Sequence, residues 1–222
     1  MNIPTPPNAR TKETREQLLR AATSAFALHG FHAASLKTIA EQAQINQALI
    51  AYHFGGKDGL YLAVFENIVQ QLQARIGERV EAIASLLNTP PATAGQDRAA
   101  LLPVVYALSD AMTELFTSEQ SRDWALLISR EQSAPTAAFE LLYEGYMGRV
   151  LNLLTQLIQR IRPQASPQEC RLLVVSLLGQ TLAFRIACTG VLRLLGWEQI
   201  GPAEVALIKA QLRRNIDHLL VE

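Results

Sequence analysis

Apolar residues recur at helical spacing along nearly the whole chain, and this pattern predicts an all-α protein. The first stripe lies on one helical face and consists of Leu18, Leu19, Ala22, Phe26 and Leu28. It stops at Gly30, a residue type that often ends helices, while Thr14 and Gln17 have the spacing of an N-terminal capping box. We therefore expect a first helix from Thr14 to Gly30.

Two short helices and one long helix are expected next. Ser35 can cap one short helix and Asn46 can cap the other. A connection of about four residues between two such helices is typical of a helix-turn-helix, which here spans Ser35–Phe54. A long apolar pattern then runs from Lys57 to about Leu87 and predicts a helix that leads into the rest of the chain.

The remainder of the chain is also patterned for helices. The stretch Asn88–Gly95 holds two prolines and two threonines and predicts a loop. Ser166-Pro167-Gln168-Glu169 combines the cap, the proline and the glutamate of a strong helix start. The helices expected after the loop span residues 97–116, 121–131, 136–161, 166–188 and 202–221. The whole chain then contains about nine helices and no strand-like alternation.

These patterns divide the chain into three parts. Residues 1–11, with three prolines among the first eight positions and no apolar periodicity, are expected to form a disordered arm. Residues 12–72 are expected to form a three-helix head that contains the helix-turn-helix. Residues 73–222 are expected to form a larger helical body, joined to the head by the long helix.

Composition adds an expectation about assembly. Hydrophobic residues make up 49% of the chain and charged residues only 18%, and the formal net charge is zero. Much apolar surface therefore needs covering, and an oligomer interface is one way to cover it. Residues 1–60 carry six basic and four acidic residues. This small excess is compatible with nucleic-acid binding but does not establish it.

Neither a membrane span nor a signal peptide is expected, so we predict a cytoplasmic protein. The longest apolar stretch, Leu172–Phe184, is interrupted by polar residues and is shorter than the roughly 20 residues that a span needs. Met1–Thr11 lacks the apolar run of a signal peptide. Cys170 and Cys188 would lie about 27 Å apart on one helix, so we expect ordinary unpaired thiols.

Motifs of enzymes are missing from the sequence. It has no nucleophile elbow, no His-Glu-x-x-His and no dinucleotide fingerprint, and Gly55-Gly56-Lys57-Asp58 lacks the spacing of a phosphate loop. We therefore expect no catalytic residue, no metal and no cofactor. A helical adaptor that binds only protein is the other alternative to a DNA-binding protein, and the helix-turn-helix argues against it.

A helix-turn-helix reads DNA because its second helix fits the major groove while flanking groups hold phosphates. Gln47, at the start of the second helix, suits a base edge, and Lys37 lies on the supporting helix. Lys57 opens the long helix, where a helix N-terminus and an ammonium group both favour a phosphate.

Thr14–Phe65 resembles the TetR family of one-component regulators. The motifs that carry the resemblance are Gly30-Phe31, Ser35-Leu36-Lys37-Thr38-Ile39-Ala40, Ile45-Asn46 and Tyr52-His53-Phe54-Gly55-Gly56-Lys57-Asp58-Gly59-Leu60. The resemblance implies that a set of residues in and after the helix-turn-helix contacts DNA. These are Lys37, Thr38, Asn46, Gln47, Ala48, Leu49, Tyr52, His53 and Lys57.

Two positions depart from the family pattern. Ala51 replaces an aromatic residue, which puts one phosphate contact in doubt, and Gln44 replaces a frequent turn glycine, which predicts an unusual turn conformation. Plain structural roles also stay open. Tyr52 and His53 could pack the head against the long helix, Lys37 could be an ordinary solvated lysine, and Phe54 is better interpreted as core.

The body resembles the CecR-like branch of the family, whose members are associated with efflux or drug-sensitivity genes. The similar segments are Ile128–Glu131, Pro135–Phe139, Leu182–Arg185 and Leu194–Trp197. The resemblance implies a small-molecule effector bound among the body helices and a homodimer formed by the last two long helices. Candidate effector residues are Trp124, Arg130, Phe139, Tyr143, Gln180 and Arg185, and candidate dimer residues are Leu173, Leu177, Phe184, Val205, Ile208, Leu212 and Ile216. The core of a monomer would explain the apolar set almost as well.

Arg130, Glu131 and Arg185 are charges within apolar helical segments, where an unpaired charge would be costly. We expect an internal ion pair, with Glu131 bound to an arginine. The alternative is an arginine presented to an anionic effector. For the chain as a whole we expect a homodimeric repressor that binds palindromic double-stranded DNA and is released by the effector.

Overall fold

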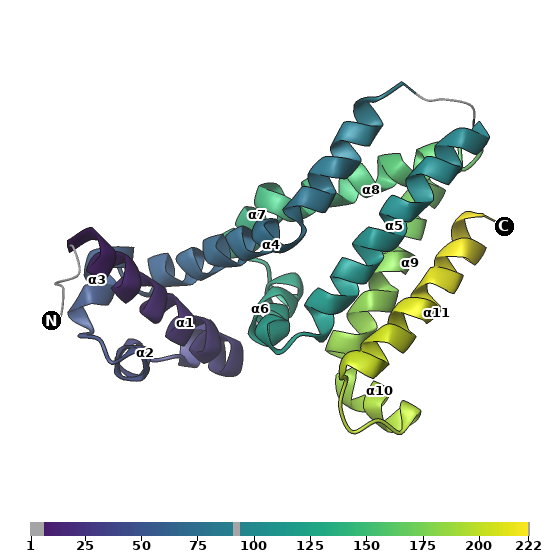
Figure 1. The fold of residues 1–222 in the computed structure, drawn as a ribbon. Helices are drawn as coiled ribbons and strands as arrows, with labels where there is room; N and C mark the ends of the chain where they lie inside the picture. The colour runs from purple at the N-terminus through teal and green to yellow at the C-terminus, as the bar shows by residue number, and fades with distance from the viewer. Residues whose placement is uncertain (1–6, 91–93, 222) are drawn as a thin grey trace, which may run out of the picture. The chain divides into compact units, whose positions relative to one another are not determined.

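A computed structural model describes residues 7–90 and 94–221, and these residues are helical nearly throughout, with no strand among them (Figure 1). The predicted all-α class is confirmed. The chain divides into two compact units. The first consists of residues 1–71 and 123–145, and the second consists of residues 72–122 and 146–222.

The first unit contains three N-terminal helices, the first part of a long fourth helix, and a later pair. Their bounds are Pro7–Ala33 (α1), Leu36–Ala43 (α2), Ala48–Phe54 (α3), Lys57–Asn88 (α4, to residue 71), Arg122–Ser133 (α6, from residue 123) and Ala137–Leu142 (α7). Large apolar side chains from several helices form its core, among them Phe26, Ile39, Ile50, Phe65 and Leu127. Helices α6 and α7 thus supply part of the core around the N-terminal helices.

The first helix starts before the expected residue and breaks at the expected one, Gly30, although α1 continues after the break to Ala33. Helix α1 begins at Pro7, so Thr14 and Gln17 lie inside it and the predicted capping box is wrong. Residues 1–6 of the expected arm lie outside the described residues. Gly30 has φ 75° and ψ 171°, which breaks the helix where the sequence predicts the stop.

The second unit contains the rest of α4 and the remaining helices. Their bounds are Ala94–Thr117 (α5), Gly148–Ile161 (α8), Pro167–Ile186 (α9), Cys188–Leu195 (α10) and Pro202–Leu220 (α11), with a short 3₁₀ turn at Glu119–Ser121. Helix α5 packs against α8, α9 and α11. The Ser166 capping box is confirmed: Glu169 N donates to Ser166 Oγ at 3.2 Å, and Ser166 N donates to Glu169 Oε2 at 2.6 Å.

Two expected helices are divided. The segment 136–161 contains a π-helical turn at Tyr143–Met147 between α7 and α8. The segment expected at 166–188 ends at Ile186, and α10 follows at a bend of 85°. Cys170 and Cys188 therefore lie on different helices, and both are free thiols, as predicted. Burial raises the pKa of the Cys170 thiol.

One helical segment, Arg98–Thr117, is long and apolar enough to cross a membrane by length and composition alone. The same segment places Leu101, Val105 and Leu108 in the core of the second unit. Core helices of this kind also meet the length criterion, so the segment is weak evidence for a membrane span.

Candidate nucleic-acid interface

The turn between α2 and α3 depends on Gln44. Its backbone has φ 56° and ψ 39°, the left-handed conformation, and it is the one non-glycine residue with positive φ in the described part of the chain. Gln44 N donates to Glu41 O at 3.0 Å, and Ile45 N donates to Ala40 O at 2.9 Å. These bonds close the end of α2, so the unusual conformation predicted for Gln44 is confirmed.

The start of α3 is fixed by Asn46. Ala48 N donates to Asn46 Oδ1 at 2.9 Å, and Leu49 N donates to the Asn46 carbonyl at 3.0 Å. The side chain therefore satisfies an N–H at the helix start, as predicted. Ser35 occupies the corresponding position before α2 with an extended backbone, but its side chain makes no capping hydrogen bond.

Helices α2 and α3 each bury one face and expose another. Ile39, Ala40 and Ile50 are buried, whereas the predicted contact residues on both helices point outward. The exposed members are Lys37, Thr38, Asn46, Gln47, Ala48, Leu49 and Tyr52. The Tyr52 side chain is 78% exposed, so it does not pack the head against α4. His53 is half-buried, with its ring centroid 5.0 Å from that of Tyr52.

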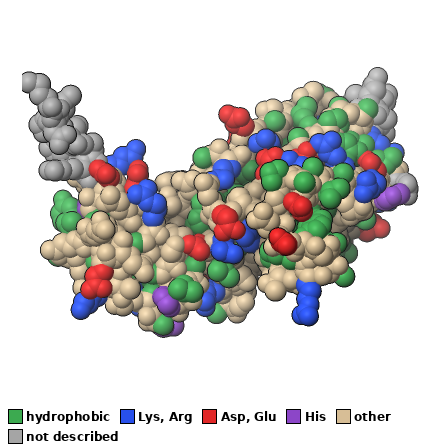
Figure 2. Space-filling model, turned by 60° about the horizontal axis from the view of Figure 1, so that its bottom comes forward, with side chains coloured by type: hydrophobic (Ala, Val, Ile, Leu, Met, Phe, Trp, Pro, Cys, Tyr) green, Lys and Arg blue, Asp and Glu red, His purple; other side chains and the backbone are tan. Residues whose placement is uncertain are grey.

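The charge on this surface comes from residues that flank α3, because α3 itself carries no Lys, Arg, Asp or Glu. Lys37 Nζ lies 3.9 Å from Glu41 Oε1, and both side chains are mostly exposed. Pairs of this kind contribute little energy, so Lys37 is not held in place by its partner. Figure 2 shows basic and acidic side chains interspersed over the face that it draws.

Lys57 has partners within its own unit. Its Nζ donates to the His32 carbonyl at 3.0 Å and lies 5.0 Å from the centroid of the Phe31 ring. The ammonium group thereby links the start of α4 to the end of α1. Its expected phosphate contact stays a prediction. Phe54 is half-buried, and the Arg15 guanidinium lies 5.4 Å from its ring centroid.

A hollow that is open to solvent lies beside the exposed face of α3, with an empty volume of about 890 Å³. It is lined by residues of α1, of the turn and of α3: Thr11, Glu13, Thr14, Gln17, Gln44, Ile45, Leu49, Tyr52 and His53. Thr14 and Gln17 were expected at a helix start and not at this hollow. Their spacing of three residues on a continuous helix is the signal that puts them on one face.

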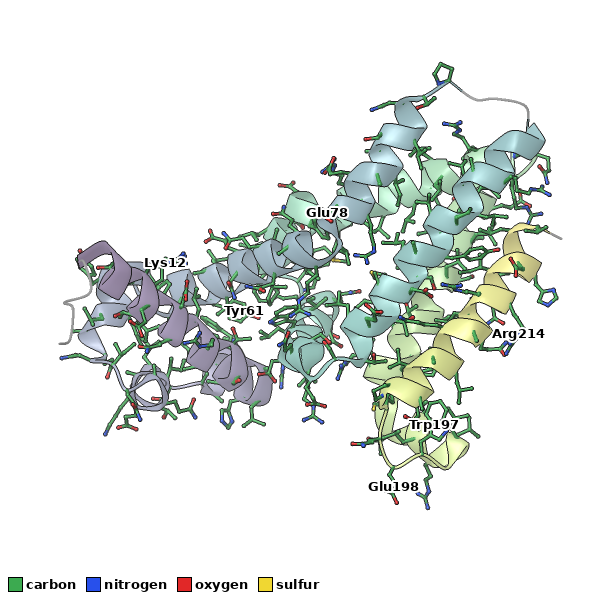
Figure 3. The ribbon with its side chains drawn as sticks, in the orientation of Figure 1. Lys12, Tyr61, Glu78, Trp197, Glu198 and Arg214 are labelled. Atoms are coloured by element: carbon green, nitrogen blue, oxygen red, sulfur yellow. The ribbon has the colours of Figure 1, made fainter. Side chains whose placement is uncertain are left out.

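A buried carboxylate lies between α4 and α7. Glu131 is 3% exposed, and its Oε1 accepts a hydrogen bond from Tyr61 Oη at 2.8 Å. Its Oε2 accepts from Thr136 N at 2.9 Å and from Thr136 Oγ1 at 2.8 Å. Figure 3 labels Tyr61 on α4. Burial, together with Glu131, raises the pKa of Tyr61 well above its usual range.

The expectation that Glu131 pairs with an arginine is wrong. Its partners in the described part of the chain are the neutral groups of Tyr61 and Thr136. Arg130 instead donates from Nη2 to Ala27 O at 3.2 Å, near the end of α1. Arg185 donates from Nη2 to the Ser118 carbonyl and, at 3.2 Å, to Ser121 Oγ, and burial lowers its pKa.

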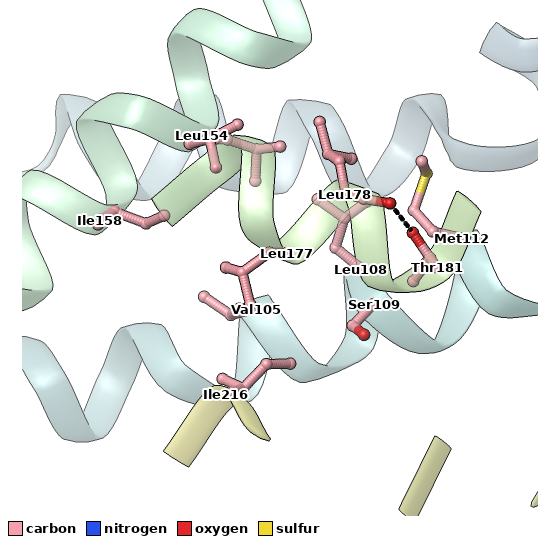
Figure 4. Close-up of a pocket in the computed structure, with 11 residues that line it drawn as sticks. Val105, Leu108, Ser109, Met112, Leu154, Ile158, Leu177, Leu178, Thr181 and Ile216 are labelled. Carbon is pink, nitrogen blue, oxygen red and sulfur yellow. Dashed lines mark hydrogen bonds between the residues drawn. The ribbon is translucent and has the colours of Figure 1, made fainter. Parts of the chain in front are cut away.

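The candidate effector residues are divided between the two units. Trp124, Arg130, Phe139 and Tyr143 belong to the first unit, and Gln180 and Arg185 belong to the second. The Phe139 and Tyr143 rings stack with centroids 5.9 Å apart. A cavity of about 40 Å³ opens within the second unit, between α5, α8, α9 and α11 (Figure 4). None of the six candidates lines it.

The candidate dimer residues also divide into two groups. Ile208, Leu212 and Ile216 lie in the core of the single chain, whereas Leu173, Leu177, Phe184 and Val205 are half-buried. Other large apolar side chains of the last three helices are exposed instead. These are Leu172, Val175, Ile186, Leu194, Leu195 and Leu207. On α9 the exposed positions are displaced by one or two residues from those predicted.

Comparison with known proteins finds two matching family models, one over the helix-turn-helix and one over the C-terminal helices. The family model described as "Bacterial regulatory proteins, tetR family" matches residues 18–64. The model described as "HTH-type transcriptional dual regulator CecR, C-terminal domain" matches residues 104–221. The HTH-type transcriptional dual regulator CecR of Shigella flexneri is 30% identical over 210 residues, which cover 94% of this chain and 92% of that protein.

Other relatives share a single part or the fold alone. The HTH-type transcriptional activator FasR of Mycolicibacterium smegmatis is 42% identical over 60 residues, 27% of either protein. The regulator FadR of Bacillus subtilis, solved in complex with stearoyl-CoA, has a TM-score of 0.60 at 14% identity and covers 92% of this chain and 97% of its own. A transcriptional regulator of Rhodococcus sp. Rha1 has a TM-score of 0.61 at 15% identity, with 92% and 96% covered. The chain therefore belongs to the TetR family of DNA-binding transcriptional regulators, in the branch of CecR.

Proposed function

We propose that this regulator is a repressor that binds palindromic DNA as a homodimer and releases it when a small molecule binds the body. The exposed face of α2 and α3 is the observation that carries the proposal. It presents polar and aromatic side chains outward while the apolar side chains beneath hold the two helices in place. We assign DNA binding to residues 12–72 and effector binding and dimerisation to residues 73–222.

The contact residues have different roles in this proposal. Gln47 directly precedes α3, and Ala48 and Leu49 begin it; residues at the N-terminus of a recognition helix face base edges in the major groove. Tyr52 and His53 follow on the same helix and contact phosphates or sugars. Ala51 is also exposed on α3, at the position where the family often has an aromatic residue. In this proposal, the phosphate contact of that aromatic residue is absent.

The residues that flank α3 hold its register on DNA. Lys37 and Thr38 are exposed on α2, and Lys57 lies at the start of α4. Asn46 uses its side-chain oxygen to cap α3 and therefore acts on the geometry of the helix, with its amide nitrogen left to meet DNA. Such contacts position the protein and carry little sequence information.

Dimerisation is supported by the exposed apolar side chains of the last three helices. Leu194 is 84% exposed, and Leu172, Val175 and Leu207 are each more than half exposed. Exposed apolar patches of this kind mark interaction sites, because covering them removes apolar area from water. In a C2 dimer the same patch meets itself, and the palindrome in DNA reflects that symmetry.

In this proposal the effector releases DNA because DNA and effector bind best to different conformations of the dimer. Two recognition helices must enter successive major grooves about 34 Å apart, so DNA favours one separation of the heads. An effector that binds better to another separation shifts the population away from it. Complete switching from 1:99 to 99:1 requires about 5.5 kcal/mol of differential binding.

We infer that the protein lowers transcription, because a dimer bound over a promoter excludes polymerase without further contacts. The relatives include a protein named a dual regulator and another named an activator. A cytoplasmic location is part of the proposal, since the operator must be accessible. A run-off transcription assay with and without the protein distinguishes repression from activation.

Selection of random duplex DNA on the purified protein tests the central proposal. We expect a palindromic motif whose half-sites lie about one helical turn, or a multiple of it, apart. A variant with Gln47→Ala should relax the preference at defined positions, while the selection with wild-type protein provides the control. Recovery of DNA without any sequence preference at all salt concentrations would overturn the proposal.

A further inference from the structure

The cavity within the second unit is lined almost entirely by aliphatic side chains. Its lining consists of Val105, Leu108, Ser109, Met112, Leu154, Ile158, Val174, Leu177, Leu178, Thr181 and Ile216. No acidic, basic or aromatic side chain is among them. Four helices contribute, and all eleven residues belong to the same unit, so the walls form one packed site (Figure 4).

Two hydroxyl groups are the polar exceptions. Thr181 is buried, and its Oγ1 donates to the Leu178 carbonyl at 2.8 Å, so its proton is already used. Ser109 is half-buried, and its carbonyl accepts from Thr113 Oγ1 at 2.8 Å. In the described part of the chain, the Ser109 hydroxyl has no hydrogen-bond partner. The cavity therefore offers one free hydroxyl in an aliphatic wall.

Water is a poor occupant of such a space. A buried water needs two to four polar partners, and this wall offers at most two, the Ser109 hydroxyl and the Thr181 oxygen as an acceptor. A charged group is a worse occupant, because transfer of an unpaired charge into apolar surroundings costs many kcal/mol, and no lining residue could neutralise it. An uncharged aliphatic group meets neither penalty and gains apolar contact.

We propose that the effector is an uncharged, mainly aliphatic small molecule with one hydrogen-bonding group, and that it binds in this cavity with that group on Ser109. The inference rests on the proposed function only in calling the occupant an effector. The cavity of about 40 Å³ is smaller than the roughly 300 Å³ of a typical ligand site, so binding must widen it. Met112 and the half-buried Leu177 and Leu178 are side chains that can change rotamer to do so.

Three probes of equal chain length test the charge requirement: 1-hexanol, hexanoate and hexylammonium. Their binding to the full-length protein is measured without DNA by isothermal titration calorimetry at pH 7.5. We expect 1-hexanol to bind at least roughly tenfold more tightly than either ion, because the ions bring an uncompensated charge. Equal or tighter binding of hexanoate would overturn the assignment of an uncharged ligand, and failure of 1-hexanol to bind would overturn the site.

Variants on adjacent positions of α5 locate the binding. Val105→Ile adds a methylene to the cavity wall, and Val104→Ile adds the same group at a half-buried position that does not line the cavity. Val105→Ile should weaken 1-hexanol binding several-fold, and Val104→Ile should leave it unchanged. Ser109→Ala should weaken the binding of 1-hexanol but not that of 1-chlorohexane. Equal effects of the two isoleucine variants would place the probe elsewhere and overturn the inference.

The effect of the same probes on DNA affinity separates this inference from the proposed function. If 1-hexanol binds in the cavity and DNA affinity is unchanged, the ligand class stands and release by that ligand fails. If the cavity binds no probe while another compound releases DNA, the proposed function stands and this inference fails. Fluorescence anisotropy of labelled operator DNA provides the measurement.

Discussion

Tyr61 Oη donates a hydrogen bond to Glu131 Oε1 at 2.8 Å, and the two residues are 70 positions apart in the chain. Both side chains are buried. The Tyr61 ring also packs edge-on against Phe26, with centroids 5.1 Å apart. One tyrosine therefore joins α1, α4 and the end of α6. Because Glu131 holds Thr136 with its other oxygen, the start of α7 belongs to the same network.

Loss of the Tyr61 hydroxyl should destabilise the protein. Tyr61→Phe keeps the ring but removes one hydrogen bond from a buried carboxylate, which should lower the free energy of unfolding by about 1.5–3 kcal/mol. Tyr146 is the matched control, because its hydroxyl is buried without a partner in the described structure. Tyr146→Phe should be neutral or stabilising. Urea denaturation measures both, and equal destabilisation would contradict the assignment.

Stability should fall in alkaline solution. Burial and Glu131 raise the pKa of Tyr61, and burial raises the pKa of Tyr146 to about 12. In the unfolded chain a tyrosine loses its proton at about pH 10. Above this value the unfolded state binds fewer protons than the folded state, so the free energy of unfolding falls with rising pH. Below it, these tyrosines contribute no pH dependence.

The slope is the quantity to measure. Each such tyrosine should contribute up to about 1.4 kcal/mol per pH unit between its unfolded and folded pKa values. Tyr61→Phe should remove its share of that slope between pH 10 and 11. A slope that is the same in wild type and variant would show that Tyr61 titrates normally in the folded protein.

Gln44 should be replaceable with a gain in stability. A side chain in the left-handed region costs about 1–2 kcal/mol, whereas glycine adopts it freely but loses more entropy on folding. We expect Gln44→Gly to raise the free energy of unfolding by up to about 1 kcal/mol. Gln42→Gly, in the exposed face of α2, should lower it by about 0.5–1 kcal/mol. Opposite signs for two nearby substitutions make the test specific to backbone conformation.

Tyr52 should contribute to DNA binding and not to stability. Removal of a hydrogen bond to a phosphate costs about 1.5–3 kcal/mol, so Tyr52→Ala should weaken operator binding by roughly 10- to 100-fold. Leu28, on α1, is also highly exposed and lies outside the predicted contact set, so Leu28→Ala should leave affinity unchanged. Thermal melts should show that both variants remain folded. Full affinity of Tyr52→Ala would remove this residue from the interface.

Lys57→Ala should weaken binding to specific and random DNA together. If its ammonium group reaches a phosphate, the slope of log affinity against log salt concentration should fall by about one. The hydrogen bond to His32 makes a loss of stability expected as well. Lys57→Gln keeps a hydrogen-bond donor without the charge and separates the two effects. An unchanged salt slope in both variants would leave Lys57 a purely structural role.

The sequence predicts features that depend on local backbone chemistry. The helix break at Gly30, the unusual turn conformation of Gln44 and the Ser166 cap form as expected, because each depends on a few neighbouring residues. The helical pattern also predicts the all-α fold. The break before α10 was not predicted, since Ala187 and Cys188 carry no proline or glycine signal.

Features that depend on distant contacts were harder to predict. The partners of Glu131 include a tyrosine on another helix, and no spacing in the sequence relates the two. On α9 the periodicity shows that apolar residues share faces, but it does not say which face is covered by the same chain. Val175 is exposed while the neighbouring Val174 is buried, and only packing decides between two faces that differ by about 100° of helix rotation.

The membership of residues 123–145 in the first unit has a consequence for protein engineering. The match to the TetR family model ends at residue 64, so an exchange of DNA specificity between regulators would be planned as a swap of the N-terminal segment alone. Such a hybrid would place two foreign helices against Glu131, Arg130 and Asp123, whose respective partners are Tyr61 on α4 and Ala27 and Ser24 on α1. A transplant that carries residues 1–71 and 123–145 together preserves these pairs, so the contacts within the transplanted unit stay native.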